Sequence, residues 1–120
     1  MVVDDAAFIR EALIQICKES GHLVVGEASD GVEAVAKALS LRPDVIIMDM
    51  VMPLKNGVEA VTEILEKMPK MKIIACSTVD QEFLKDRALK AGCLGFVSKP
   101  FKKIEIIEAL SLVRQLQPAI

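Results

Sequence analysis

Tryptophan and tyrosine are absent from the sequence, which has one histidine and three cysteines among its 120 residues. The single histidine, His22, stands in a Gly-His turn, which favours a surface imidazole and gives poor support for zinc-hydrolase or serine–histidine chemistry. The cysteines, Cys17, Cys76 and Cys93, are odd in number, widely spaced and set among apolar residues. This pattern favours reduced, buried thiols of a cytoplasmic protein over a metal or redox role.

The chain also lacks an excess of basic charge and a long hydrophobic run. Its 15 Lys and Arg residues stand against 17 Asp and Glu residues, for a formal net charge of −2. This balance gives no basic surface for nucleic acid. No apolar stretch approaches the ~20 residues that span a bilayer, and no signal peptide opens the sequence. We therefore expect a cytoplasmic protein that neither crosses a membrane nor binds nucleic acid directly.

The composition and periodicity indicate one α/β domain covering residues 1–120. Apolar residues make up 52% of the chain and charged residues 27%, which is typical of a globular protein. Short β-branched runs alternate with amphipathic helical stretches. The runs are residues 1–3, 23–28, 44–48, 72–76 and 94–97. The alternation predicts a doubly wound, five-stranded parallel sheet with five helices on its two faces.

Two predicted helices start with nearly the same letters, "DGVEAV" at residues 30–35 and "NGVEAV" at residues 56–61. Asp30 and Asn56 belong to the residue types whose side chains cap a helix N-terminus. Because the flanking sequences share nothing else, we interpret the match as two good helix starts rather than as a duplication.

Residues suited to phosphate chemistry follow four of the five predicted strands. They are Asp4-Asp5, Asp49, Ser77-Thr78 and Ser98-Lys99-Pro100. Ligands of an open α/β sheet bind beyond the carboxyl ends of its strands, so these residues are expected to meet at one edge. Helix capping would otherwise explain Asp4-Asp5 or Ser77, and Lys99 would be a solvated loop charge. Asp49 resists such an explanation, because "VIIMDMVMP" surrounds it with apolar residues and burying an unpaired charge is costly.

The joint chemistry of these residues is that of phosphoryl transfer. Mg²⁺ prefers oxygen ligands and typically takes carboxylates, waters and phosphate oxygens. Three aspartates around one point would repel one another unless such an ion neutralised them. A carboxylate beside Mg²⁺ can attack a phosphoryl group in line, while a serine hydroxyl and a lysine contact its equatorial oxygens. The sequence therefore predicts that Asp49 accepts phosphate, with Ser77 and Lys99 beside it.

Taken together, "VVDD", "DMVMP" with "NGVEA", "IIACS" and "SKPF" make the chain resemble a response-regulator receiver domain of the single-domain chemotaxis (CheY-like) type. The resemblance covers essentially all of the chain. It implies a flavodoxin-like sheet in the strand order 2-1-3-4-5. It also implies a cis peptide bond between Lys99 and Pro100.

The resemblance further assigns individual roles at the site. Asp49 would be the phosphoacceptor, with Asp5 as a direct Mg²⁺ ligand and Asp4 acting largely through water. The third protein ligand would be the backbone carbonyl of Val51. The remaining roles would fall to Ser77 and Lys99, which contact the phosphoryl group, and to Phe96 as the aromatic rotamer switch that acts with Ser77.

The implied function is that of a response regulator in two-component signal transduction, in chemotaxis or motility-type signalling. The phosphodonor would be the phosphohistidine of a histidine kinase, and small phosphodonors would substitute for it. An output protein would dock on the face formed by residues 80–91, 94–97 and 103–117. Such a protein is not an enzyme in the ordinary sense, but an autocatalytic phosphoacceptor with intrinsic autodephosphorylation.

This interpretation has three alternatives. A haloacid-dehalogenase-type phosphatase needs a second acid where Val51 stands. A flavodoxin needs a hydroxyl-rich phosphate loop after the first strand and aromatic residues that stack on the flavin, whereas this chain has "DDAAF" there and no Trp or Tyr. The third alternative is an excised N-terminal receiver of a larger regulator, such as a DNA-binding transcription factor.

The sequence departs from the family pattern at three places. Phe96 stands where tyrosine is common, so a contact through a hydroxyl is excluded. Val51 and Val79 are apolar where polar residues are frequent, which predicts slow loss of phosphate. The first strand run has only three residues, so either the native start lies upstream or this strand is unusually short.

Overall fold

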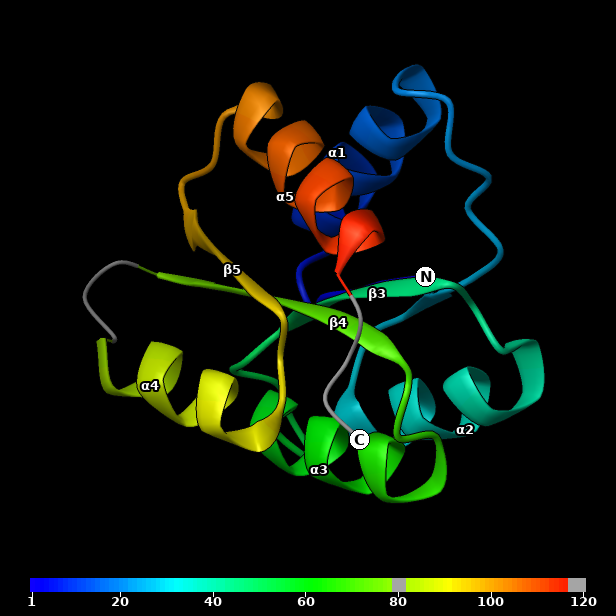
Figure 1. Ribbon diagram of the computed structural model, residues 1–120, viewed down its shortest axis with the longest axis vertical. Coiled ribbons are helices and arrows are strands. Elements are labelled where there is room, and N and C mark those ends of the chain that lie inside the picture. The colour runs from blue at the N-terminus through cyan, green and yellow to red at the C-terminus, as the bar shows by residue number, and fades with distance from the viewer. Residues whose placement is uncertain (79–81, 117–120) are drawn as a thin grey trace.

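The computed structural model describes residues 1–78 and 82–116, and these form five strands that alternate with five helices (Figure 1). The strands are β1 (Val2–Val3), β2 (Glu27–Ala28), β3 (Val45–Asp49), β4 (Lys72–Thr78) and β5 (Gly95–Lys99). The helices are α1 (Ala7–Glu19), α2 (Gly31–Leu41), α3 (Gly57–Lys67), α4 (Glu82–Ala91) and α5 (Lys103–Gln115). Among these residues, no helix has the length and apolar character that crossing a bilayer requires.

All strand pairs are parallel, in the order β2-β1-β3-β4-β5, which confirms the predicted fold class and strand order. Helices α1 and α5 cover one face of the sheet, and α2, α3 and α4 cover the other (Figure 1). Each face has its own apolar core: Ile46 and Met48 of β3 belong to one, and Ile47 belongs to the other. Burial on both faces explains why β3 is a continuous apolar run rather than an alternating one.

The strand boundaries differ from the prediction at both edges of the sheet. The predicted strand 23–28 is wrong in extent, because β2 contains only Glu27 and Ala28. These residues pair with Val2 and Val3 of β1, and β1 offers no earlier residues for the segment before Glu27. The strands predicted at 72–76 and 94–97 run two residues further, because Ser77 and Thr78 pair with Ser98 and Lys99. The polar residues at these two ends therefore lie within the ladder.

Both predicted helix caps are confirmed. The side chain of Asp30 accepts a hydrogen bond from the N–H of Glu33 at 2.8 Å, and Asn56 accepts one from Glu59 at 2.9 Å. The residue after the second cap is held tightly against the end of β3: a Cβ on Gly57 would lie 2.3 Å from the carbonyl oxygen of Asp49. Only glycine allows this approach, so the start of α3 fixes the backbone directly behind Asp49.

The three cysteines are free and buried, as the sequence predicted. Burial raises the pKa of Cys76 and of Cys93 to about 12. Both thiols therefore stay protonated and unreactive at neutral pH, which fits a packing role.

A cavity of about 360 Å³ opens at the amino edge of the sheet, between the segment before β2 and the start of β3. Met1 ends the ladder there, with its buried ammonium donating to the carbonyl of Val45 at 2.9 Å. Within the described part of the chain, the backbone N–H groups of Leu23, Val24 and Val25 have no hydrogen-bond partner. The backbone N–H groups beside this cavity are therefore available to pair with further strand residues.

Four β-branched residues fused ahead of Met1 should raise the free energy of unfolding by about 1–3 kcal/mol, since two or three ladder hydrogen bonds become available. Urea denaturation measures the change. A Gly-Ser extension of equal length is the control, because it removes the same terminal charge and adds little strand propensity. Equal midpoints for the two extensions would contradict the prediction.

Candidate functional site

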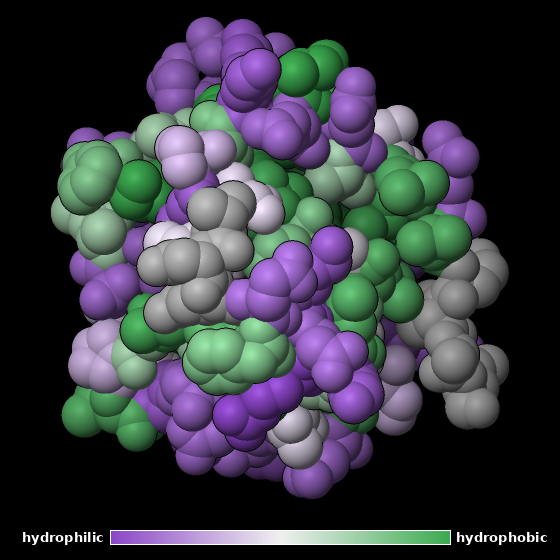
Figure 2. All heavy atoms as spheres, turned by 90° about the vertical axis from the view of Figure 1, so that its left-hand side faces the viewer, coloured by the Kyte–Doolittle hydropathy of each residue, from purple (hydrophilic) through white to green (hydrophobic). Residues whose placement is uncertain are grey.

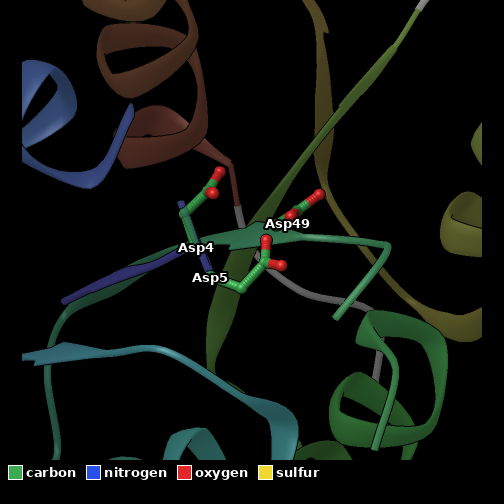
Figure 3. A group of neighbouring side chains, drawn as sticks. All are labelled: Asp4, Asp5 and Asp49. Carbon is green, nitrogen blue, oxygen red and sulfur yellow. The ribbon is translucent and has the colours of Figure 1, made fainter. Parts of the chain in front are cut away.

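Three carboxylates gather at the carboxyl edge of the sheet (Figure 3). Asp4 and Asp5 follow β1, and Asp49 is the last residue of the neighbouring strand β3. One carboxylate oxygen of each lies within 4.8 Å of the others. Asp4 and Asp49 are buried, whereas Asp5 is exposed. The structure therefore brings these three residues together at one edge of the sheet, as the sequence predicted.

Lys99 reaches this cluster from the end of β5. Its Nζ lies 2.7 Å from Oδ2 of Asp4 and 3.5 Å from Oδ1 of Asp49. Burial alone would lower the pKa of Lys99, but the hydrogen bond with Asp4 and the charges of Asp49 and Asp4 outweigh it and raise the pKa. Lys99 is therefore a fixed cation of the site, and the alternative of a solvated loop charge is wrong.

Asp4 does not cap the first helix. Its Oδ1 accepts a hydrogen bond from the N–H of Ala6 at 2.9 Å, which closes a turn before the helix begins. Ala6 itself stands at the N-cap position of α1, and no side chain caps it. With its other oxygen on Lys99, Asp4 ties the loop after β1 to the far side of the site.

Burial raises the pKa of Asp49 to about 6. The charge of Lys99 opposes this shift, the charges of Asp4 and Asp5 add to it, and a backbone hydrogen bond from Val51 opposes it. That bond runs from the N–H of Val51 to Oδ1 of Asp49 at 3.3 Å. At pH 7 the carboxylate is therefore mostly ionised but poorly solvated, a suitable state for a nucleophile.

The other predicted site residues lie on the strands and loops around Asp49. Ser77 is buried in β4, between the strands that carry Asp49 and Lys99. Phe96 of β5 is half-buried, and Nζ of Lys85 on α4 lies 5.6 Å from the centre of its ring. The predicted cis peptide between Lys99 and Pro100 is present. Val79 lies outside the described residues.

Apolar side chains also stand exposed around this edge. Val51 is 49% exposed, and Leu54 in the same loop is 82% exposed. Phe8 in the first turn of α1 is 73% exposed. On the side of the molecule shown in Figure 2, such hydrophobic surface is interspersed with hydrophilic surface.

The donor set fits Mg²⁺. All three acidic side chains offer hard oxygen ligands, and their oxygen atoms are close enough to surround one ion. Three carboxylates against the single ammonium of Lys99 leave the cluster with excess negative charge. A divalent cation would neutralise this excess, and the exposed Asp5 leaves the site open to it.

Sequence reasoning missed Arg10 of α1 and Gly57 of α3. Nη1 of Arg10 donates to the backbone carbonyl of Asp4 at 2.7 Å. In the sequence, Arg10 has the appearance of an ordinary charge on the polar face of a helix, and no local pattern indicates this contact. Gly57 stood in a quoted motif, but its close approach to the backbone of Asp49 is a tertiary feature.

Comparison with known proteins identifies the class. Residues 1–111 match the response regulator receiver domain. The chain is 44% identical over 113 residues to the chemotaxis protein CheY of Thermotoga maritima, covering 94% of each chain. It is 38% identical over 112 residues to the transcriptional regulatory protein PdtaR of Mycobacterium tuberculosis, covering 93% of this chain and 54% of that one. The chain belongs to the receiver domain family of two-component response regulators, and it has CheY homologues.

A solved structure agrees with this assignment. A chain from the CheX–CheY–BeF₃–Mg²⁺ complex of Borrelia burgdorferi superposes with a TM-score of 0.90 at 28% identity, covering 96% of this chain and 87% of that one. Receiver domains are phosphoacceptors rather than ordinary enzymes, and the family uses Mg²⁺ at an acidic pocket.

Replacing Asp49 by asparagine should stabilise the metal-free protein at neutral pH, by about 1–3 kcal/mol. The raised pKa means that the folded protein holds the proton of Asp49 more tightly than the unfolded chain does. The parent therefore gains stability from Asp49 at low pH and loses it as the pH rises through about 6.

Urea denaturation of parent and Asp49→Asn between pH 4 and pH 8, with chelator present, measures this difference. The advantage of the variant should be largest above pH 7 and should vanish toward pH 4. Asp86→Asn, which changes an exposed carboxylate on α4, controls for the loss of one surface charge. A difference that does not change with pH would contradict the assigned pKa shift.

Proposed function

We propose that this protein is a response regulator that accepts a phosphoryl group on Asp49 from the phosphohistidine of a histidine kinase. The observation that carries the proposal is the buried carboxylate of Asp49, which lies beside the acidic pair Asp4-Asp5 and within 3.5 Å of the ammonium of Lys99. A purely structural ion pair would not need three carboxylates around one cation. The cluster of carboxylates and the nearby ammonium support a site that would hold a metal ion and a phosphoryl group together.

The reaction requires one bond to form and one to break. A carboxylate oxygen of Asp49 bonds to phosphorus while the phosphorus–nitrogen bond of the donor breaks, and the electron pair stays on the imidazole. Lys99 lies nearer to Asp4 than to Asp49, and it would be in reach of a phosphoryl oxygen on Asp49. The buried hydroxyl of Ser77 would contact another oxygen.

Mg²⁺ would be held by Asp5, Asp49 and the backbone carbonyl of Val51, with Asp4 acting through water. When bound, the ion offsets the negative charge that the incoming phosphoryl group brings. Its arrival would also weaken the hold of Asp4 on Lys99, because both cations compete for the same carboxylate.

The output surface would be the face of α4, β5 and α5. Nearly all described residues of the predicted 80–91 and 103–117 segments lie in α4 and α5. Ser77 and Phe96 are on neighbouring strands, and Lys85 links the ring of Phe96 to α4. Movement of Ser77 toward the phosphate would let Phe96 turn inward, which would shift α4 and favour binding of an output protein.

The CheY relative supports chemotaxis-type signalling by a single domain covering residues 1–120, because the match covers 94% of that protein as well as of this chain. The second candidate is the receiver part of a larger regulator. The similarity to PdtaR supports this alternative, because the chain matches only 54% of the length of that longer protein. The cytoplasmic location stays a prediction.

Incubation with a small phosphodonor and Mg²⁺ should add one phosphate, at Asp49. Intact-mass spectrometry detects the addition, and loss of the label in hydroxylamine identifies an acyl phosphate. Asp49→Asn should abolish labelling, whereas Asp86→Asn should retain it. Undiminished labelling of Asp49→Asn at another residue would overturn the assignment.

Loss of the phosphate should be slow in the parent and several-fold faster in Val51→Thr. The half-exposed valine offers no hydrogen bond to a water approaching Asp49, and threonine supplies a hydroxyl at nearly constant volume. Val51→Asn and Val79→Glu extend the series, and Val51→Ile is the apolar control. Decay of the phosphorylated proteins is followed by mass spectrometry after removal of the donor. Equal decay rates throughout would contradict the prediction.

A further inference from the structure

We propose that Arg10, anchored by Glu27, is a positioning residue that holds the acidic loop after β1 and thereby sets the affinity of the site for a divalent cation. The inference rests on the proposed function, because it concerns the metal site that this function needs. Arg10 lies outside the cluster of three aspartates and would not bind the metal ion itself. It acts through its bond to the backbone of Asp4.

The guanidinium of Arg10 bridges the acidic loop and the edge strand of the sheet. Nη1 donates to the carbonyl oxygen of Asp4 at 2.7 Å, and Nε donates to Oε1 of Glu27 at 2.7 Å. The side chain of Arg10 is only 18% exposed. Helical side chains point back toward the start of their helix, so a residue in the first turn of α1 reaches over the preceding loop. A planar group with two such bonds has one orientation.

Apart from the bonds of the Asp4 side chain with Ala6 and Lys99, the loop has few other constraints on its position. β1 and β2 are only two residues long, and the N–H of Asp4 makes the last bond between them, to the carbonyl of Ala28 at 3.1 Å. The side chain of Asp5 makes no hydrogen bond or ion pair with any residue that the structure describes. The place of Asp5, the expected direct ligand, therefore depends on the backbone that Arg10 holds.

Glu27 is itself held in place, which makes it an anchor rather than a floating partner. Nζ of Lys37 on α2 donates to the backbone carbonyl of Glu27 at 2.6 Å and pairs with Glu33 at 3.1 Å. The contacts run from α2 through the edge strand to Arg10 and end at the carbonyl of Asp4. They tie two helices to the loop where the strand ladder is shortest.

Charge and position predict opposite effects for the loss of Arg10. A cation near the cluster repels a metal ion, so its removal would by Coulomb's law alone strengthen metal binding. If Arg10 acts by holding the loop, its removal weakens metal binding instead. Residues that orient metal ligands typically contribute about 10–100-fold to metal affinity. The sign of the change therefore separates the two roles.

The test measures the affinity of the protein for Mn²⁺, which serves as a probe of the divalent-cation site. The electron paramagnetic resonance signal of free Mn²⁺ gives the bound fraction, and competition by Mg²⁺ shows that both ions use the same site. We expect Arg10→Ala to bind Mn²⁺ about 10-fold more weakly than the parent. Arg10→Lys keeps the charge but cannot make both bonds, so it should bind more weakly too. Backbone amide signals of Asp5 and Ala6 in ¹⁵N NMR spectra should broaden or shift in both variants without metal.

Lys90→Ala is the matched control, because it removes one positive charge and one ion pair from the distant end of α4. It should bind Mn²⁺ as the parent does. Unchanged or tighter binding by Arg10→Ala would overturn the inference and leave the proposed function intact. A parent that binds neither Mn²⁺ nor Mg²⁺ would overturn the proposed function itself. If Arg10→Ala does not fold, Arg10→Lys and Glu27→Ala provide the test. Both should bind Mn²⁺ more weakly than the parent, and unchanged or tighter binding by both would overturn the inference.

Discussion

The arrangement of this protein depends on one contact across the sheet, from the ammonium of Lys99 to the carboxylates of Asp4 and Asp49. Its two arms measure 2.7 Å and 3.5 Å, and both acids are buried. Without this cation, clustered carboxylates would face one another in a poorly solvated place, and a buried charge left without its partner costs about 3–5 kcal/mol. The strand order serves this contact, because it brings the ends of β1, β3 and β5 to one edge with β4 between them.

The same contact suggests how the site would change when a metal ion and a phosphoryl group bind. In the structure Lys99 is closer to Asp4 than to Asp49, and burial raises the pKa of the Asp49 carboxyl to about 6. A divalent cation would neutralise the carboxylate charge that Lys99 balances in the structure. Lys99 would then be able to bind a phosphoryl oxygen. Phe96, three residues before Lys99 on the same strand, is the proposed point at which this change reaches α4.

The sequence was sufficient for the fold class and for the edge at which the site lies, because the rule that links strand ends to ligand sites needs only the order of elements. It was insufficient where tertiary pairing decides. The length of β2 depends on how many residues β1 offers, and the ends of β4 and β5 depend on Ser77 pairing with Ser98. The bond from Lys99 to Asp4 joins residues 95 positions apart, and no local pattern encodes it. The roles of the Val51 carbonyl and of Phe96 stay predictions.

A crystal structure with Mg²⁺ and beryllofluoride, which mimics a phosphoryl group on a carboxylate, tests the central claim most directly. The account predicts one beryllofluoride on Asp49, with Nζ of Lys99 moved from Asp4 to a fluorine and the hydroxyl of Ser77 on another. Mg²⁺ should contact Asp5, Asp49 and the carbonyl of Val51. An adduct at any other residue, or one on Asp49 with Lys99 still bound to Asp4, would contradict it.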